Sequence, residues 1–319
     1  MNAVKEVIET DSSRERLLQM LDTALGKAQK AHLDDSRVVD LLLNPDGHLW
    51  AERLGENCTD TGAAVGPDQA QQVLKLVADA TKTICNEKNP ILYAELPGSG
   101  DRFTGIFPPV VKNPVFAIRK KALLVYTLAD YVTQGIITEQ QKEVISAGVA
   151  AKQNFLVAGG AGSGKTTLLN AILAEIAQTN DRIVIIEDIV ELQCQASNQV
   201  AMRTLDYISM NQLLAAAMRL SPDRIVIGEV RGPEALTLVK AWNTGHPGGA
   251  CSIHANSCRA ALRRLESLIL EAIPNPQREL IAEAVNLIIY IEKYQQSRRI
   301  KEIAAVEGFE NGQYLLKQI

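Results

Sequence analysis

The feature that most constrains the fold is a series of four apolar runs in the second half of the chain, each followed by a helical pattern. The runs are NFLVAG (residues 154–159), RIVIIED (182–188), RIVIGE (224–229) and ACSIHA (250–255). Such near-continuous apolar segments are typical of strands in a parallel sheet that helices cover on both faces. We therefore expect an α/β domain with a mostly parallel sheet in this half.

The first run leads into residues 159–166, GGAGSGKT, which fit the pattern G-x-x-x-x-G-K-[ST]. The position between an expected strand and an expected helix makes this match specific for a phosphate-binding P-loop. Glycines let backbone N–H groups point at phosphate oxygens, and the next helix adds its positive N-terminus. Lys165 should reach the β- and γ-phosphates of ATP, and Thr166 should ligate Mg²⁺. The predicted nucleotide-binding residues are Gly159, Gly160, Ala161, Gly162, Ser163, Gly164, Lys165, Thr166 and Thr167.

Two of the later runs end in acidic residues, Glu187 and Asp188 after the second run and Glu229 after the third. Ligands of doubly wound sheets lie at the carboxyl ends of the strands, so these acids should face the P-loop. There, together with Thr166, they can hold Mg²⁺ directly or through water, and one of them can activate the attacking water. Gly228 stands where an Asp often precedes the Glu. The sequence therefore leaves open which acid binds the metal ion and which acid activates the water.

The first half of the chain reads as a smaller α+β domain. A Ser12-x-x-Glu15 capping box opens an amphipathic helix over residues 14–32, SRVVDLLL (36–43) reads as a short helix, and Pro67 starts another helix. Short strands are expected at residues 48–55, 91–96, 102–107 and 115–120.

The pattern changes around residues 120–138, where we place the join between the domains. We expect an N-terminal domain over residues 1–126, a linker over 127–138 and a P-loop domain over 139–319. Near the end of the chain, Asn311-Gly312 between two alternating runs predicts a C-terminal β-hairpin.

The segment GHPGGACSIHANSC places His246, Cys251, His254 and Cys258 in the spacing H-x4-C-x2-H-x3-C. A zinc site would require all four to converge, yet a strand puts Cys251 and His254 on opposite faces, and structural zinc sites favour tighter pairs. We therefore expect no zinc, and cysteines that act as small apolar fillers. His254 is either a group that responds to the nucleotide, which we favour, or a buried core histidine. The preceding glycines, Gly245, Gly248 and Gly249, should let this loop shift.

Composition narrows the class of protein. With 46% hydrophobic and 22% charged residues in 319, the chain is typical of a globular protein, and its net charge of −4 provides no basic field for direct nucleic-acid binding. Short basic clusters such as Arg263-Arg264 and Arg298-Arg299 read as solvated faces. Five cysteines make no disulfide framework, and no apolar run approaches the length of about 18 residues that a membrane span needs. These features predict a cytoplasmic protein whose membrane association is peripheral.

Four segments occur in the order and spacing of the secretion-superfamily traffic ATPases: GGAGSGKTT, IIEDIVEL, RIVIGEVRGPEA and TGHPGGACSIHANS. The chain resembles this family over most of its length, and NPDGHLWAERLG and GDRFTGIFPPVV resemble its type IV secretion and conjugation branch. The resemblance implies a RecA-like ATPase domain and a homohexameric ring. It also implies a cytoplasmic enzyme bound peripherally to the inner membrane, with inner-membrane components of the secretion channel as partners.

The resemblance also implies roles for individual residues. Glu187 matches the acid-box glutamate that helps to orient water, Glu229 matches the Walker-B glutamate, and His254 matches a histidine that contacts or signals across the active site. Arg102 and Arg119 match arginines that the N-terminal domain presents toward the nucleotide, often across a subunit boundary. With Lys165, these are the expected catalytic residues. Arg231 lies in the matching GEVRG segment and receives no role.

Other functions stay open beside an ATP-driven motor for assembly or transfer. One is an ATP-gated docking ring with little turnover, and the nearest alternative within the family is a type IV pilus assembly or retraction motor. A nucleic-acid translocase is disfavoured because aromatic and basic residues do not interleave. A GTPase switch is disfavoured because no N-K-x-D motif follows the P-loop.

Overall fold

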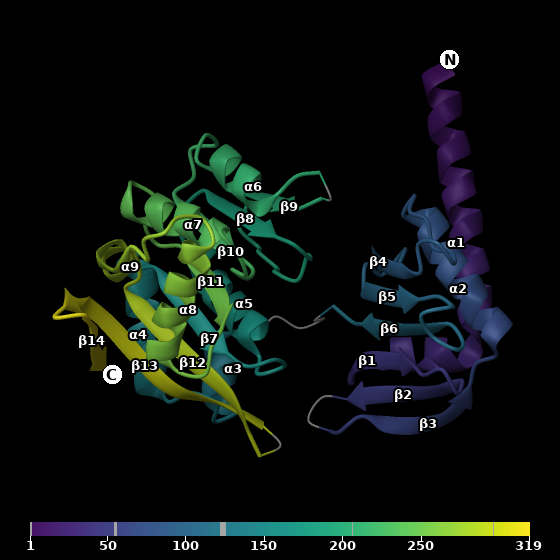
Figure 1. Cartoon of the computed structure of the whole chain (residues 1–319), viewed down its shortest axis with the longest axis horizontal. Coiled ribbons are helices and arrows are strands. Elements are labelled where there is room, and N and C mark those ends of the chain that lie inside the picture. Colours follow the sequence, from purple (N-terminus) through teal and green to yellow (C-terminus); the bar gives the residue numbers. More distant parts are fainter. Residues whose placement is uncertain (1, 54–55, 122–125, 206, 296) are drawn as a thin grey trace. The chain divides into compact units, whose positions relative to one another are not determined.

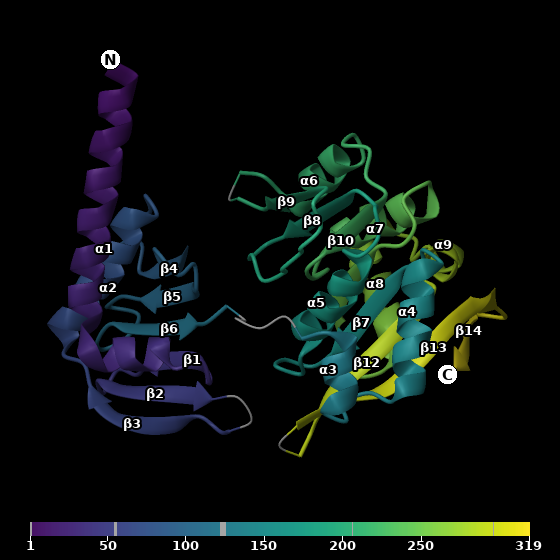
Figure 2. The same ribbon diagram turned by 180° about the vertical axis from the view of Figure 1, so that it is seen from behind.

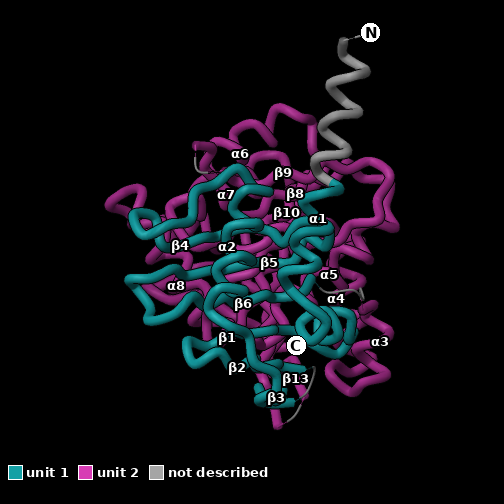
Figure 3. The backbone as a smooth tube through the Cα atoms, turned by 90° about the vertical axis from the view of Figure 1, so that its right-hand side faces the viewer, with its two compact units in different colours: residues 1–123 teal, residues 124–319 magenta. Residues whose placement is uncertain are grey.

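The chain forms two compact units, residues 1–123 and residues 124–319 (Figure 3). The computed structural model describes the backbone of residues 2–53, 56–121, 126–205, 207–295 and 297–319, and the side chains from Glu15 onward. Residues 54–55 of the expected strand 48–55, and residues 122–125 at the expected domain join, lie outside the described residues.

Unit 1 is a six-stranded antiparallel sheet with two helices on one face (Figure 1). The strands, in their order across the sheet, are β3 (Thr59–Ala64), β2 (His48–Arg53), β1 (Val38–Leu43), β6 (Val115–Arg119), β5 (Arg102–Ile106) and β4 (Ile91–Glu95). The helices are α1 (Asn2–Asp34) and α2 (Pro67–Ala80). Apolar residues of both helices and of the sheet form one core, which confirms the expected α+β class.

Two local predictions for this unit are wrong. Residues 38–43, expected in a helix, form β1, which pairs with β2 on one side and β6 on the other. A short apolar run does not distinguish a buried helix from a buried strand, so the neighbouring strands decide. Helix α1 begins at Asn2 rather than near Ser12, and Gly26, with φ of 72°, interrupts its helical geometry.

Unit 2 is an eight-stranded sheet with helices on both faces, which confirms the expected α/β fold (Figures 1 and 2). Across the sheet the strands are β14 (Gln313–Gln318), β13 (Ser297–Glu310), β12 (Leu287–Tyr294), β7 (Phe155–Gly159), β11 (Ala250–His254), β10 (Arg224–Ile227), β8 (Ile183–Glu187) and β9 (Gln199–Arg203). From β12 to β9 all neighbours are parallel. Strands β7 and β8 are buried at every position, as a sheet covered on both faces requires.

The helices of unit 2 divide between the two faces. On one face lie α6 (Met210–Ala217), α7 (Glu234–Asn243), α8 (Cys258–Leu270) and α9 (Arg278–Ala284). On the other lie α3 (Leu128–Thr133), α4 (Glu139–Ala150) and α5 (Lys165–Ile176). The segment expected as a linker, 127–138, contains α3. Thr127 caps this helix and Tyr131 is buried in the core of unit 2, so the segment belongs to the packed domain.

The C-terminal hairpin is confirmed. Strands β13 and β14 are antiparallel and meet at Asn311 and Gly312, whose φ angles of 51° and 77° are those of a tight hairpin turn. Strand β12, which the sequence did not predict, joins this hairpin to the parallel sheet beside β7. None of the helices in the described part of the chain is both long and apolar enough to cross a membrane.

Candidate active site

The glycine-rich loop lies where the sequence predicted it, between β7 and α5. Gly164 is the N-cap of α5 with φ of 96°, a left-handed conformation that glycine adopts without steric cost. A Cβ atom on Gly159 would lie 2.6 Å from the carbonyl oxygen of Ile291, so the loop can pass close to β12 only without a side chain. These two glycines hold the loop in a shape that opens the α5 N-terminus to an anion.

The loop keeps polar groups available inside it. Lys165 is only 8% exposed, and its Nζ donates to the carbonyl oxygen of Gly160 at 3.0 Å. Burial lowers the pKa of Lys165, while the Glu229 carboxylate opposes this shift. The Ser163 hydroxyl is buried and has no hydrogen-bond partner among the described residues. A buried ammonium group and an unpaired hydroxyl in one glycine loop fit a phosphate group.

The expected acids meet the P-loop at the carboxyl edge of the sheet. Glu187 is the last residue of β8, Asp188 follows it, and Glu229 comes two residues after the end of β10. They share one small pocket, whose lining residues are Thr166, Glu187, Asp188, Ile189, Glu191, Gly228, Glu229 and Arg231. The sheet therefore gathers residues from three separate segments of the sequence around Thr166, as its topology predicts.

The two glutamates have different surroundings. Glu187 is 4% exposed, and its Oε1 accepts hydrogen bonds from the backbone N–H groups of Glu191 at 2.9 Å and Leu192 at 2.8 Å. By contrast, Glu229 Oε1 is buried and lies 2.9 Å from Nε2 of His254. Glu187 thus fixes its own loop, whereas the Glu229 carboxylate faces another side chain of the site.

The structure also explains the glycine before Glu229. A Cβ atom on Gly228 would lie 3.1 Å from Cγ and 3.3 Å from Oε1 of Glu187. That is tighter than ordinary van der Waals contact, so an Asp at this position would push Glu187 away from its backbone partners. Gly228 and the inward position of Glu187 therefore depend on each other.

His254 lies between the P-loop lysine and the Glu229 carboxylate. Its Nδ1 is 3.4 Å from Lys165 Nζ, and its Nε2 is 2.9 Å from Glu229 Oε1. A neutral imidazole that carries its proton on Nε2 suits both neighbours, because Lys165 can only donate. Burial lowers the pKa of His254 and the Lys165 and Arg231 charges add to this, while Glu229 opposes them. Its side chain is 51% exposed, so the alternative of a buried core histidine is wrong.

Arg231, for which no role was expected, contacts two of the acids. Its Nε donates to Glu229 Oε2 at 2.7 Å, and its Nη1 is 4.0 Å from Asp188 Oδ2. Asp188 also accepts a hydrogen bond from the Thr204 hydroxyl at 3.0 Å. Arg231 therefore holds one oxygen of Glu229 in place, while His254 contacts the other.

Two cations that no sequence motif marks lie beside the P-loop, Lys293 and Arg298. A Cβ atom on Gly162 would lie 3.1 Å from Lys293 Nζ, and one on Gly164 would lie 3.1 Å from Arg298 Nε. Arg298 Nε is buried with no hydrogen-bond partner among the described residues, so reading this arginine as part of a solvated face is wrong. Both residues come from the β12–β13 hairpin, far along the chain from the P-loop, and no local motif marks them.

The donor atoms near the loop fit Mg²⁺. Thr166 and the carboxylates offer only oxygen ligands, which Mg²⁺ prefers. Among the described residues no three or more His, Cys, Asp or Glu side chains are placed to enclose a metal ion. A metal here would depend on phosphate oxygens and water for the rest of its coordination, as is usual for Mg²⁺ with nucleotides.

The histidines and cysteines of GHPGGACSIHANSC have different partners. His246 Nδ1 lies 3.0 Å from the carbonyl oxygen of Pro222, while His254 faces Glu229. Cys251 is fully buried, and the Cys258 thiol lies 3.6 Å from the carbonyl oxygen of Ile288. Burial raises the pKa of both thiols, so they stay protonated and behave as small apolar groups.

Two of the glycines in this segment are fixed rather than free to shift. A Cβ atom on Gly248 would lie 2.7 Å from Arg224 Nη1, and both Gly248 and Gly249 are buried. Gly249 N–H donates to Asn154 Oδ1 at 2.9 Å. Only Gly245 has open space around its Cα, so any movement of this loop would be confined to its beginning.

The two N-terminal arginines lie together in unit 1. Arg102 and Arg119 are directly opposite each other on β5 and β6. Arg119 donates from Nε and Nη2 to the two carboxylate oxygens of Asp40 at 2.8 and 2.7 Å. The Arg102 side chain has no hydrogen bond or ion pair with a described residue. Their role toward the nucleotide stays a prediction.

Comparisons with known proteins agree with these features. The Type II/IV secretion system protein family matches residues 103–302. Conjugal transfer protein TrbB of Rhizobium radiobacter is 47% identical over 304 residues, which cover 95% of this chain and 94% of that protein. Type IV secretion system protein VirB11 of Bartonella quintana is 28% identical, over 86% of this chain and 89% of VirB11. The pilus retraction motor PilT with bound ADP has a similar fold, with a TM-score of 0.61 at 18% identity over 91% of this chain and 80% of PilT. The chain belongs to the Type II/IV secretion system protein family, which confirms the resemblance carried by its four motifs.

Proposed function

We propose that this chain hydrolyses ATP, with Mg²⁺, to power assembly of or transfer through a conjugation or type IV secretion apparatus. The observation that carries the proposal is the convergence of Lys165, His254 and the Glu229 carboxylate beside the P-loop. The biological setting is supported by the 47% identity to a conjugal transfer protein over nearly the whole of both chains.

Residues 159–167 bind the phosphates in this proposal. The backbone N–H groups of the loop and the N-terminus of α5 surround them, and Lys165 exchanges its bond to the Gly160 carbonyl for a β- or γ-phosphate oxygen. Ser163 donates its unpaired hydroxyl. Thr166 and the neighbouring acids hold Mg²⁺, which when bound offsets the negative charge of the phosphates.

Glu229 orients the attacking water and accepts its proton. The bond from Arg231 to Oε2 restricts rotation of the carboxylate. Oε1, which His254 Nε2 contacts at 2.9 Å, therefore has a defined direction and becomes available to water when His254 turns to a phosphate oxygen. Glu187 supports this arrangement by holding the loop at Glu191 and Leu192. Asp188 would help to hold the metal, directly or through water.

His254 senses whether the γ-phosphate is present. Neutral imidazole beside Lys165 can donate from Nε2 to a phosphate oxygen or turn to Glu229, 2.9 Å away. Because His254 ends β11 and α8 begins four residues later, a change of partner would pass directly to that helix. Lys293 and Arg298 add positive charge to the phosphates from the hairpin side.

Arg102 acts as a cation supplied from the N-terminal domain, across a subunit boundary of a homohexameric ring. A positioned arginine can supply much of the rate in phosphoryl transfer. Arg119, which is bound to Asp40, positions the end of β6 beside Arg102. ATP-driven movement between the units of residues 1–123 and 124–319 would then do work on inner-membrane components from the cytoplasmic side.

The proposal is tested by phosphate release from the purified chain with and without Mg²⁺, together with its native mass with and without Mg·ATP. We expect Mg²⁺-dependent turnover and a hexameric mass with nucleotide. ATP binding without turnover would instead support an ATP-gated docking ring. A pilus motor has less support, because the 18% identity to PilT shows the fold alone.

A further inference from the structure

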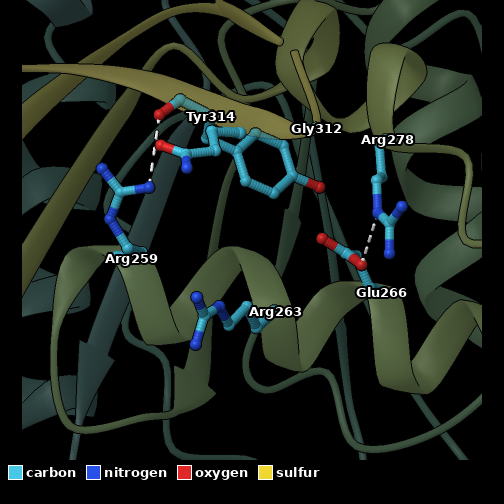
Figure 4. Close-up of a pocket in the computed structure, with 7 residues that line it drawn as sticks. Arg259, Arg263, Glu266, Arg278, Gly312 and Tyr314 are labelled. Atoms are coloured by element: carbon cyan, nitrogen blue, oxygen red, sulfur yellow. Dashed lines mark hydrogen bonds and ion pairs between the residues drawn. The ribbon is translucent and has the colours of Figure 1, made fainter. Parts of the chain in front are cut away.

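A second pocket lies between α8, α9 and the β13–β14 turn (Figure 4). Its volume is about 690 Å³. The lining residues are Arg259, Arg263, Glu266, Arg278, Gly312, Gln313 and Tyr314. None of them lines the pocket of Thr166 and Glu229, so nothing in the proposed hydrolysis accounts for this cluster.

Positive charge in the pocket is only partly compensated. Arg278 Nε donates to Glu266 Oε2 at 2.9 Å, which pairs one arginine with the single carboxylate (Figure 4). Arg259 Nη1 contacts the Tyr314 carbonyl oxygen at 3.4 Å, a long hydrogen bond, and Arg263 has no hydrogen bond or ion pair with any described residue. All three arginines are exposed, so two guanidinium groups remain accessible to a ligand.

The pocket also holds a buried hydroxyl. Tyr314 is 5% exposed, and Figure 4 shows its ring crossing the pocket, with the hydroxyl directed toward Glu266 and Arg278. Burial raises the pKa of Tyr314, and the charge of Glu266 and a hydrogen bond to it add to this, so the hydroxyl keeps its proton. Glu266, the carboxylate of the pocket, therefore faces both Arg278 and the Tyr314 hydroxyl.

We propose that this pocket binds an acidic peptide segment of a partner protein, whose carboxylates pair with Arg259 and Arg263. The planar guanidinium group matches a carboxylate through two parallel hydrogen bonds. A volume of about 690 Å³ exceeds the space that one inorganic anion needs and lies within the usual range for ligand pockets.

The position of the pocket favours an extended peptide. Gln313 and Tyr314 belong to β14, the edge strand of the sheet, and an edge strand can pair with an added extended segment. Nucleic acid is disfavoured because the Tyr314 ring is buried and offers no face on which a base can stack.

The test measures binding of fluorescently labelled hexaglutamate to the full chain by anisotropy at low salt. We expect saturable binding that Arg263→Ala weakens by roughly tenfold or more, because a charge-assisted hydrogen bond is lost. Arg264→Ala is the matched control, since this neighbour is exposed and does not line the pocket. Tyr314→Phe should weaken binding less and leave the melting temperature unchanged.

Several outcomes would overturn the proposal. These are equal binding of hexaglutamine, equal weakening by Arg264→Ala, and tighter binding of inorganic phosphate or of a DNA oligonucleotide at the same arginines. A smaller native mass of Arg263→Ala would assign the pocket to a contact between copies of the chain. Phosphate release by Arg263→Ala should match that of the wild type, so failure of this proposal and failure of the ATPase proposal can be told apart.

Discussion

The two ends of the parallel sheet in unit 2 differ in whether their buried polar groups have hydrogen-bond partners. At the carboxyl end, Ser163 Oγ and, beside Gly164, Arg298 Nε are buried without a hydrogen-bond partner among the described residues. At the amino end, Arg224 is 1% exposed, and its Nε donates to Asp181 Oδ2 at 2.7 Å. Its other nitrogens donate to the carbonyl oxygens of Gly248 and Val149 at 3.1 and 2.9 Å.

This difference indicates that the carboxyl end of the sheet serves ligand binding and the amino end serves the stability of the fold. A buried polar atom without a partner costs about 1–3 kcal/mol, so a fold retains several together only where a ligand satisfies them. A buried ion pair whose hydrogen bonds are all made cannot bind a ligand. Removing one of its partners, however, strongly lowers the stability of the fold. Substitutions at the carboxyl end should therefore reduce turnover, and those at the amino end should reduce stability.

The largest expected effect is that of Lys165→Ala, which should reduce phosphate release to background because the phosphates lose their positioned cation. The melting temperature should change little. Lys142→Ala is the control, since Lys142 is a surface residue of α4 that pairs with Glu139. Turnover near that of the wild type in Lys165→Ala would show that the P-loop assignment is wrong.

Arg224→Met should destabilise unit 2 by about 3–5 kcal/mol, because Asp181 and two carbonyl groups lose a buried partner. Each unit contains one tryptophan, Trp50 or Trp242, so urea unfolding in a Trp50→Phe background reports on unit 2 alone. Turnover per folded molecule should stay close to that of the wild type. The matched control is Arg182→Met at the equivalent start of β8. A similar loss of unfolding free energy in both variants would show that the buried Arg224 contributes no more to stability than Arg182.

Glu229→Gln should keep ATP binding but lower turnover by about 10²-fold, the scale of a lost general base. Glu187→Gln should lower it less, because the amide oxygen can still accept from the Glu191 and Leu192 N–H groups. Phosphate release and binding of a fluorescent ATP analogue separate the two steps. A larger loss for Glu187→Gln would make Glu187 the main acid.

Low pH should lower the stability of unit 2, because Asp181 at the amino end of the sheet becomes protonated. Burial alone would raise its pKa, but hydrogen bonds from Lys152, Arg224 and Thr179 outweigh this and lower it to about 2. A lowered pKa means that the stabilisation is complete above the unfolded-state value and is lost as the pH falls through the folded-state value. About 2 kcal/mol should disappear between roughly pH 4 and pH 2. Urea unfolding of Asp181→Asn should lack this part of the pH dependence, and an unchanged dependence would contradict it.

The smallest effect should come from the segment of Gly245–Cys258. His254→Ala should lower turnover by about tenfold, the worth of one hydrogen bond to a charged group, with little change in melting temperature. The control is Cys251→Ser combined with Cys258→Ala, which should cost only modest stability and leave turnover unchanged. One zinc ion per chain in elemental analysis, lost in the cysteine variant, would instead favour a metal site.

Elements with short, local sequence signals could be predicted without the structure. The P-loop is marked by closely spaced glycines before Lys165, and the parallel strands by uninterrupted apolar runs. The acids at residues 187 and 229 followed from the rule that strand ends meet at one edge of the sheet. Each of these signals spans fewer than about ten residues, so no knowledge of distant neighbours was needed.

Identical local sequences differ in burial and in hydrogen-bond partners, and only the folded structure shows this difference. The tetrapeptide RIVI begins at both Arg182 and Arg224. Arg182 is half-buried and donates to Asn198 and to the Leu220 carbonyl oxygen, whereas Arg224 is buried against Asp181. Arg298 became a P-loop neighbour in the same way, through strand pairing with distant residues. The burial and the ion pairs of a side chain depend on which distant segments the sheet places beside it. That arrangement is set by the whole fold and cannot be read from four or five consecutive residues.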